Sequence, residues 1–166
     1  MKTFKNKPIT LYGETKKRGD IAPDFRALNN KGEFMSLSDF KARYIIINVV
    51  PSLDTTVCDR QTRTVNTELV ERDDLTVLTI SNDLPYAQAR WCGNAGLKNV
   101  ITLSDYLEHD FGKKYGTLIK ENKLLARSIF VLNEKREIIY VEYVDEMTQH
   151  LNYDELIAFV RDMPKN

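Results

Sequence analysis

Apolar positions along the chain follow two spacings, and each spacing predicts a type of element. Residues 44–50 form an apolar run that is rich in β-branched side chains and is followed by Pro51. Such a run predicts a strand that is buried on both faces of a sheet. The patterns farther along predict strands at 75–81, 99–103, 127–132 and 137–143, and helices at 58–72, 84–92 and about 105–115.

The last helix of the chain has the clearest start signal. Asn152 is a candidate N-cap, and Glu155 follows three residues later, which is the spacing of a capping box. Leu156, Val160 and Met163 recur at helical spacing, so we expect them to face the core. These positions predict that a helix packed on the core closes the chain.

Turn signals dominate the first part of the chain. Asn6-Lys7-Pro8 and Gly13-Glu14 predict a β-hairpin over about residues 3–17. Strands that alternate with helices and end in a hairpin imply an α/β fold, in which helices cover both faces of a mixed central sheet. No repeat or linker divides the 166 residues, so we predict a single domain over 1–166 with residues 1–18 as a hairpin extension.

Composition narrows the class of partner. The 24 basic and 24 acidic side chains balance, so no net field favours nucleic acid or an anionic membrane. No stretch approaches the roughly 18 consecutive apolar residues of a membrane-spanning helix, and residues 1–8 lack the apolar core of a signal peptide. We therefore expect a cytoplasmic protein, in which two cysteines are more often free or catalytic than structural.

Cys58 is the first candidate for chemistry, because it opens the predicted helix 58–72 just after a buried strand. Backbone N–H groups in the first turn of a helix have no intrahelical partner, and they stabilise an anion there. The thiolate is the reactive form of cysteine, so this position indicates a nucleophilic or redox site. The alternative is a space-filling residue, since Cys58, Val65 and Leu69 share one helical face and cysteine is often buried.

The residues around Cys58 also match a known signature. Pro51, Thr55 and Cys58 stand as P-x-x-x-T-x-x-C, which resembles the active-site motif of the peroxiredoxins. The longer string PSLDTxVCD is similar to the thiol peroxidase subfamily in particular. Three further stretches resemble that subfamily and follow in the same order, namely residues 19–25, 90–97 and 125–131.

This resemblance implies a thioredoxin-like fold and an atypical two-cysteine mechanism. Cys58 would be the peroxidatic cysteine, and Cys92 would be the resolving cysteine that forms a disulfide with it in the same chain. Thr55 and Arg127 would hydrogen-bond the thiolate or the peroxide, and Pro51 would shield the thiolate from water. The resemblance also implies a homodimer, thioredoxin as the reductant, some preference for organic hydroperoxides, and no metal, flavin or haem cofactor.

Thr55 and Arg127 also have interpretations that involve no catalytic role. Thr55 stands where a hydroxyl commonly bonds a local backbone group in a turn. Arg127 opens a predicted strand after an apolar stretch. A charge in such a place needs a partner, because burying it unpaired is costly. A carboxylate is therefore the alternative partner for Arg127.

Cys92 lies beside a helical stripe that consists of Leu84, Ala87 and Trp91. We expect the helix to end at Cys92, before Gly93, where a helix end frays readily. Trp91 departs from the subfamily, in which another aromatic residue is usual, and the departure bears on how this helix packs. The alternative for Cys92 is an incidental thiol.

Other redox functions place their cysteines differently. A peroxiredoxin whose resolving cysteine lies on the peroxidatic helix needs a second cysteine within a few residues of Cys58, and the sequence has none. The sequence also lacks the C-x-x-C motif of a thioredoxin-type dithiol exchanger. A non-enzymatic redox sensor or relay would keep the same two cysteines, and it remains the alternative to a peroxidase.

Overall fold

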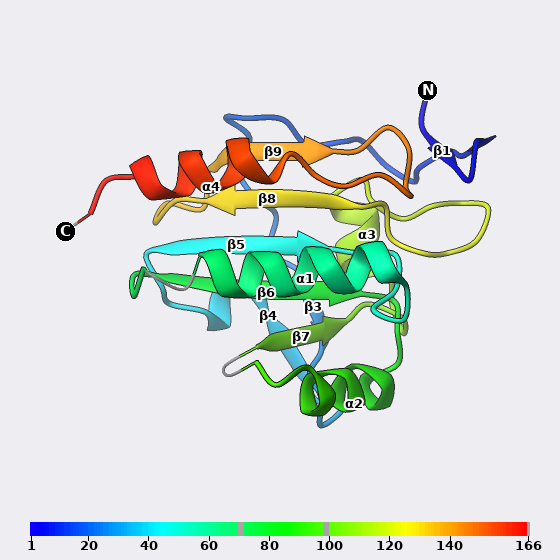
Figure 1. Cartoon of the computed structure of the whole chain (residues 1–166), viewed down its shortest axis with the longest axis horizontal. Coiled ribbons are helices and arrows are strands. Elements are labelled where there is room, and N and C mark those ends of the chain that lie inside the picture. Colours follow the sequence, from blue (N-terminus) through cyan, green and yellow to red (C-terminus); the bar gives the residue numbers. More distant parts are fainter. Residues whose placement is uncertain (70–71, 98–99, 166) are drawn as a thin grey trace.

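A mixed sheet forms the centre of the computed structural model, which describes residues 1–69, 72–97 and 100–165. Its strands are β3 Arg26–Leu28, β4 Phe34–Ser36, β5 Tyr44–Val49, β6 Leu75–Ser81, β7 Ile101–Ser104, β8 Ser128–Leu132 and β9 Ile138–Tyr143. Within the described residues the seven strands have the order β4-β3-β7-β6-β5-β8-β9 (Figure 1). The pairs β5–β6 and β6–β7 are parallel, and the other neighbouring pairs are antiparallel. The predicted mixed sheet is confirmed.

Helices cover both faces of this sheet, as the sequence predicts. The helices are α1 Thr56–Glu68, α2 Pro85–Ala95, α3 Asp110–Lys114 and α4 Tyr153–Asp162, and Leu37–Asp39 forms a short 3-10 turn. In Figure 1, α1, α2 and α4 lie in front of the sheet and α3 lies behind it. α1 covers the central strands β5 and β6, whereas α2 lies beside β7.

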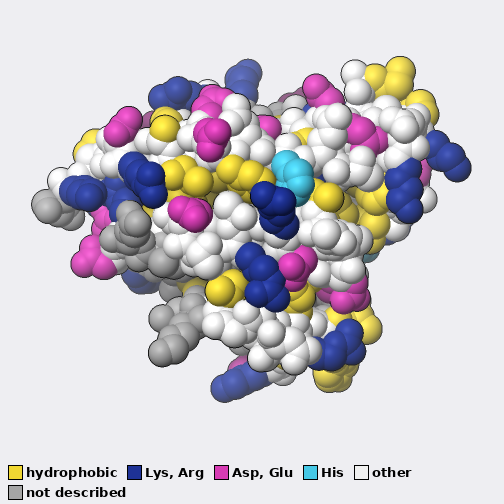
Figure 2. Space-filling view, in the orientation of Figure 1, with side chains coloured by type: hydrophobic (Ala, Val, Ile, Leu, Met, Phe, Trp, Pro, Cys, Tyr) yellow, Lys and Arg dark blue, Asp and Glu magenta, His cyan; other side chains and the backbone are white. Residues whose placement is uncertain are grey.

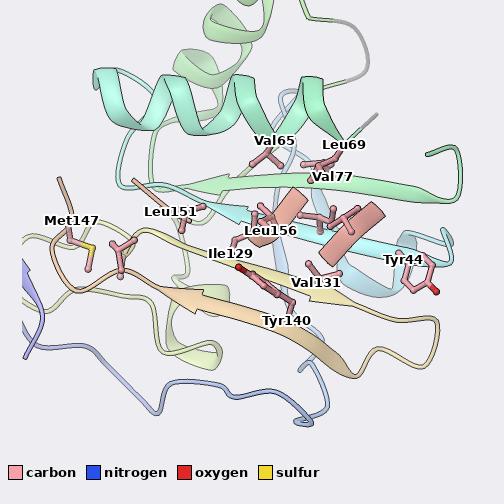
Figure 3. Packing of buried hydrophobic residues seen from close by; sticks show 14 of the residues in the cluster. Tyr44, Val65, Leu69, Val77, Ile129, Val131, Tyr140, Met147, Leu151 and Leu156 are labelled. Carbon is pink, nitrogen blue, oxygen red and sulfur yellow. The ribbon is translucent and has the colours of Figure 1, made fainter. Parts of the chain in front are cut away.

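Alternating residues of each strand supply two separate apolar layers. On the α1 and α4 side, Val65 and Leu69 point from α1 toward Val77 of the sheet, and Leu156 of α4 joins the same cluster (Figure 3). The opposite layer contains aromatic rings packed edge to face or stacked, namely Phe25, Phe111, Tyr115 and Phe130. Because β5 is buried between both layers, its carboxyl end is a fixed platform for the residues that follow.

The predicted start and inner face of the last helix are confirmed. The side-chain oxygen of Asn152 accepts a hydrogen bond of 3.2 Å from the backbone N–H of Glu155. Leu156, Val160 and Met163 are buried in the layer that α4 shares with α1.

The N-terminal hairpin is present but shorter than predicted. Its strands are β1 Thr3–Phe4 and β2 Lys7–Pro8. Lys5 and Asn6 form the turn with positive φ angles of 51° and 64°. After Pro8 the chain pairs with a distant segment instead, since the backbone N–H of Tyr12 donates to the carbonyl of Leu118. This long-range pairing prevents the hairpin from extending to residue 17.

Some predicted boundaries also differ from the observed ones. The helix predicted at 58–72 begins earlier, at Thr56, and is assigned as far as Glu68. Residues 70–71 of that prediction, and residue 99 of the predicted strand 99–103, lie outside the described residues. The helix predicted near 105–115 is confined to α3, because the Asp105 carboxylate accepts the backbone N–H groups of Phe111 and Gly112 at 3.0 and 2.8 Å. The preceding residues form the turn that brings Asp105 to that position.

The surface carries no concentration of one charge on the face in Figure 2, where basic and acidic side chains are interspersed. Among the described helices, none combines the length and the apolar character that crossing a membrane requires.

Candidate active site around Cys58

The loop between β5 and α1 is held by one carboxylate. Asp83 accepts hydrogen bonds from the Ser52 hydroxyl at 2.7 Å, from the Leu53 backbone N–H at 2.8 Å, and from the Ser81 hydroxyl at 2.7 Å. Pro51 begins the loop and is buried. The end of the central strand and the start of α1 are therefore fixed relative to each other.

The first turn of α1 leaves backbone donors available. Thr55 is the N-cap residue, and its side chain makes no capping hydrogen bond. The first helical bond runs from the Asp59 N–H to the Thr55 carbonyl at 2.9 Å, so the N–H groups of residues 56–58 precede the helical ladder. The exposed Thr55 hydroxyl donates to the Ser52 carbonyl at 3.1 Å. This bond matches the turn role predicted for Thr55, in which the hydroxyl bonds a local backbone group.

Cys58 and Arg127 meet in the interior of the protein. Arg127 Nη2 lies 3.2 Å from Cys58 Sγ, and the two residues are 2% and 0% exposed. The guanidinium is fixed on its other edges as well. Its Nε and Nη2 atoms donate to the Met147 carbonyl at 3.0 and 2.8 Å, and Nη1 donates to Gln61 Oε1 at 2.8 Å.

A buried amide network continues from the guanidinium into the sheet. Gln61 Nε2 donates to Asn48 Oδ1 at 2.6 Å and to the Val49 carbonyl at 3.1 Å. Asn48 Nδ2 in turn lies 3.2 Å from the Thr62 hydroxyl and 3.3 Å from the Thr79 hydroxyl. Because these buried groups are hydrogen-bonded to one another, they hold a single arrangement. The network orients Gln61, and Gln61 orients Arg127.

The charge of Arg127 has no carboxylate counterpart in the described part of the chain. None of the ion pairs found there includes Arg127, so the alternative prediction of a salt bridge is not supported. Its described hydrogen-bond partners are Met147, Gln61 and Cys58. Of these three, only the sulfur of Cys58 can carry a negative charge.

The charges of this site affect the pKa values of two side chains near the start of α4. Burial raises the pKa of Tyr153, and the positive charges of Arg127 and Arg60 oppose that increase. Burial also lowers the pKa of His150, and the same two arginines lower it further. The Tyr153 hydroxyl lies 3.3 Å from His150 Nδ1. These two side chains therefore lie within the field of the Cys58 site.

The predicted end of the second cysteine's helix is wrong. α2 continues through Gly93 to Ala95 and ends at Gly96, whose φ angle is 69°. Glycine costs little inside a helix, whereas the left-handed conformation at a helix end is costly for a residue that carries a Cβ atom. Gly96 meets that requirement, so Gly93 stays helical and Cys92 lies inside the last turns.

The apolar stripe predicted for this helix, Leu84, Ala87 and Trp91, does not coincide with the inner face of α2. Leu84 is 50% exposed, whereas Gln88 is fully buried and donates to the Ser81 hydroxyl at 3.0 Å and to the Leu103 carbonyl at 2.9 Å. A polar residue at the centre of the inner face gives no apolar signal in the sequence, and this is why the stripe was misplaced.

Cys92 lies in a different environment from that of Cys58. Its Sγ atom is 3.5 Å from the Thr102 hydroxyl of β7 and 4.0 Å from Asn30 Nδ2. The Thr102 hydroxyl donates to Asn30 Oδ1 at 2.7 Å. Both cysteines are free thiols. The structure thus brings Arg127 to Cys58, with Pro51 and Thr55 in the adjoining loop, and holds Cys92 against β7.

Sequence reasoning missed three residues that shape this site. Gln61 lies one turn after Cys58 and therefore shares its face of α1. Asn48 is a polar residue inside the apolar run 44–50, and a buried amide needs partners. Both signals were available in the sequence. The Met147 carbonyl left no such signal, because any residue carries a backbone carbonyl.

These observations define a class of protein: a thioredoxin-like fold with a cysteine in the first helical turn after a central strand. A profile of the Redoxin family matches residues 17–157, and the chain therefore belongs to the Redoxin family. It is 51% identical over 163 residues to a thiol peroxidase of Bacillus subtilis, with 98% of each chain covered. It is 48% identical over 161 residues to a thiol peroxidase of Staphylococcus epidermidis, with 97% of this chain and 98% of that protein covered.

Solved structures agree with this assignment. The crystal structure of a peroxiredoxin-like protein from Aquifex aeolicus matches with a TM-score of 0.89 and 34% identity, over 97% of this chain and 95% of that chain. A thiol peroxidase from Chromobacterium violaceum has a TM-score of 0.87 over the same shares, and at 22% identity it shows the fold alone. The predicted thioredoxin-like fold and the resemblance to thiol peroxidases are confirmed.

Proposed function

We propose that this protein is a thiol-dependent peroxidase that reduces hydrogen peroxide and organic hydroperoxides. The observation that carries the proposal is the 3.2 Å contact between Arg127 Nη2 and Cys58 Sγ. A buried cation is costly unless an anion accompanies it, and the Cys58 thiolate is the anion that this contact can supply. The relatives named thiol peroxidases support the same activity.

In the first step, the Cys58 thiolate attacks one oxygen of the peroxide. The S–O bond forms as the O–O bond breaks, so sulfur is oxidised to a sulfenic acid and the peroxide is reduced to water or an alcohol. The leaving oxygen takes up a proton. Arg127 and the N–H groups of residues 56–58, which precede the helical ladder, stabilise the charge that develops during this step.

Thr55 and Pro51 have supporting roles in this proposal. The hydrogen of the Thr55 hydroxyl is engaged by the Ser52 carbonyl, so the hydroxyl oxygen is directed to accept a hydrogen bond from the peroxide O–H. Pro51 is buried at the start of the loop, and it keeps water from the thiolate.

The cycle closes through Cys92. Its thiol condenses with the Cys58 sulfenic acid, which forms an S–S bond and releases water, and an external dithiol then reduces the disulfide by exchange. We propose thioredoxin as this dithiol, a homodimer as the assembly, the reducing cytoplasm as the location, and residues 1–166 as one catalytic domain. The balanced surface charge of Figure 2 supports a small substrate over nucleic acid.

A coupled assay tests this function. The full chain is mixed with thioredoxin, thioredoxin reductase, NADPH and a hydroperoxide, and the oxidation of NADPH is followed. We expect many equivalents of peroxide to be consumed per protein and the rate to depend on thioredoxin. Consumption of a single equivalent, without turnover, would contradict the proposal and favour the redox sensor or relay.

A further inference from the structure

The two helices that carry the cysteines are joined by a small polar cluster. Asp59 follows Cys58 on α1, and its Oδ1 atom accepts a hydrogen bond of 2.7 Å from the indole N–H of Trp91 on α2. Its Oδ2 atom accepts from Arg63 Nε at 2.9 Å. Arg63 Nη1 donates to the carbonyl of Ala95 at 2.9 Å. We name Asp59, Arg63 and Trp91 the inter-helix clamp.

Trp91 connects this clamp to the apolar residues around Cys58. Its ring packs against the small apolar cluster of Val50, Leu53 and Cys58. The guanidinium of Arg63 lies 5.5 Å from the centre of the same ring. The indole therefore packs against the residues around Cys58 while its N–H group binds Asp59 of α1.

The neighbouring residues Trp91 and Cys92 point to different parts of the protein. Consecutive residues of an α-helix are turned by about 100°. Trp91 accordingly binds Asp59 of α1, whereas Cys92 Sγ lies 3.5 Å from the Thr102 hydroxyl of β7. The thiol of Cys92 is thus directed at the sheet while the indole faces the other cysteine's helix.

A disulfide requires a rearrangement of this region. The two sulfur atoms must come within about 2.05 Å of each other, with suitable Cα positions. Cys58 Sγ is held in contact with Arg127, and Cys92 Sγ is held against Thr102. We expect the end of α2 or the start of α1 to unwind before the two sulfur atoms meet. Because each cysteine is adjacent to a clamp residue, unwinding on either side separates the indole from Asp59.

We propose that the inter-helix clamp sets the rate at which Cys92 resolves oxidised Cys58. This inference rests on the proposed function. With the clamp closed, Cys58 stays beside Arg127 and attacks peroxide. With the clamp open, the Cys58 sulfenic acid meets the Cys92 thiol, the S–S bond forms and water leaves. A sulfenic acid that waits behind a closed clamp is exposed to a second peroxide, which oxidises it to a sulfinic acid and is itself reduced to water or an alcohol. Asp59, Arg63 and Trp91 are positioning residues for this step.

The variant Trp91→Phe isolates the clamp. It keeps an aromatic ring against Val50, Leu53 and Cys58, changes no charge and removes the N–H donor to Asp59. Tyr86→Phe is the matched control, since Tyr86 lies on the same helix, is 83% exposed and also loses one polar group from its ring.

The two steps of oxidation are separated in a rapid-mixing experiment on the reduced full chain. Samples are quenched with an alkylating reagent, and mass spectrometry of peptides measures the sulfenic acid, the disulfide and the sulfinic acid. In Trp91→Phe we expect the disulfide step, which does not depend on peroxide concentration, to be about tenfold faster, because a hydrogen bond to a charged group is lost. The peroxide-dependent step should match the parent, and overoxidation of half the protein should need about tenfold more peroxide, since faster resolution shortens the life of the sulfenic acid.

Equal disulfide rates in Trp91→Phe and Tyr86→Phe would overturn the proposal. A rate change in the first step alone would also overturn it, because the indole would then act on peroxide attack. If the parent forms no Cys58–Cys92 disulfide at all, the proposed function fails, and that result is visible before any variant is compared.

Hydrogen exchange of the reduced protein provides a readout that needs no peroxide chemistry. We expect Trp91→Phe and the second variant Arg63→Met to exchange faster than the parent at residues 58–63 and 88–95, with no change in β8. Faster exchange throughout the protein would indicate a general loss of stability and would overturn the clamp, as would unchanged exchange in both helices.

Discussion

Cys58 and Cys92 are the same residue type in the same chain, yet they differ in burial, in their position along a helix and in the charge of the group that they contact. Cys58 is fully buried, lies in the first turn of α1 and contacts a guanidinium. Cys92 is half-buried near the end of α2 and contacts a neutral hydroxyl. In the function proposed above, the first environment suits a nucleophile, and the second suits a thiol that has to move before the disulfide forms.

The position of each helix on the sheet extends this contrast. α1 covers the central strands, and its buried Val65 and the C-cap residue Leu69 belong to the apolar layer that α1 shares with α4. α2 lies beside β7, and the described buried residues of its inner face are Pro85, Gln88 and Ala95. Less apolar surface anchors α2, so opening it costs less free energy than opening α1. We therefore expect α2 to move further when the disulfide forms.

Exchanging each thiol for a hydroxyl should produce the largest difference between the two regions. Cys58→Ser should abolish peroxide turnover, because an alcohol does not supply the thiolate nucleophile. Cys92→Ser should reduce one equivalent of peroxide and then stop at the sulfenic acid, which excess peroxide overoxidises. Mass spectrometry and the thioredoxin-coupled assay measure both outcomes. Normal recycling of Cys92→Ser by thioredoxin would remove Cys92 from the mechanism.

Removing the guanidinium should affect the Cys58 region alone. Arg127→Met should slow peroxide attack by on the order of a hundredfold, since a preorganised charged donor is lost. Condensation of an already formed sulfenic acid with Cys92 should be slowed much less. Stopped-flow rates at several peroxide concentrations separate the two steps. Arg161→Met, at a side chain that is 54% exposed, is the control, and a parental attack rate in Arg127→Met would assign the arginine a structural role.

Two buried glutamines allow a matched test, one on each cysteine's helix. Gln61→Met removes the acceptor for Arg127 Nη1 and should slow peroxide attack by about tenfold, since it deletes a hydrogen bond to a charged group. Gln88→Met deletes bonds to Ser81 and Leu103, so it should lower the free energy of unfolding without changing the attack rate. Denaturant unfolding and stopped-flow kinetics measure the two effects. Equal attack rates in both variants would contradict the positioning role of Gln61.

The smallest expected effect concerns the carboxylate of Glu146, which stabilises the Cys58 region from a distance. Burial raises the pKa of Glu146, but hydrogen bonds from the Asn6 N–H, from Thr148 and from the Thr3 hydroxyl outweigh it and hold the pKa at about 2. These bonds tie the N-terminal hairpin to the segment that carries the Met147 carbonyl.

Because the folded pKa of Glu146 lies below its unfolded value, its contribution to stability is present above about pH 4.5 and is lost as the pH falls toward 2. Glu146→Gln should therefore be less stable than the parent near neutral pH and should lose less stability on acidification. It should also slow peroxide attack slightly. Glu121→Gln removes a similar anchor to Thr10, outside the Met147 segment, and should leave the attack rate unchanged. Thermal unfolding between pH 2 and pH 7 checks the first expectation.

Much of the fold could be predicted from the sequence, because the patterns that specify strands and helix caps extend over only a few residues. The strand predicted at 75–81 has the observed bounds of β6, and the cap at Asn152 was predicted from two residues. The end of α2 was mispredicted because Gly93 and Gly96 both suit a helix end. The choice between them follows from backbone conformation, which the sequence pattern does not contain.

Only the part of the site that is contiguous in the sequence could be predicted from the sequence. Pro51, Thr55 and Cys58 lie in one motif, and the family resemblance named Arg127 without locating its other contacts. The Met147 carbonyl and the bond between Trp91 and Asp59 depend on how distant elements pack. Periodicity and spacing carry no information on such contacts.

The distance along the chain between Cys58 and Arg127 has a consequence for biosynthesis. The two residues are 69 positions apart, and the carbonyl that orients the guanidinium comes later still, at Met147. At about 5–20 residues per second, a ribosome needs several seconds to make the intervening segment. During that interval the nascent chain holds Cys58 without the guanidinium that contacts it in the folded protein. The contact between Cys58 and Arg127 thus becomes possible only once most of the sheet has been synthesised.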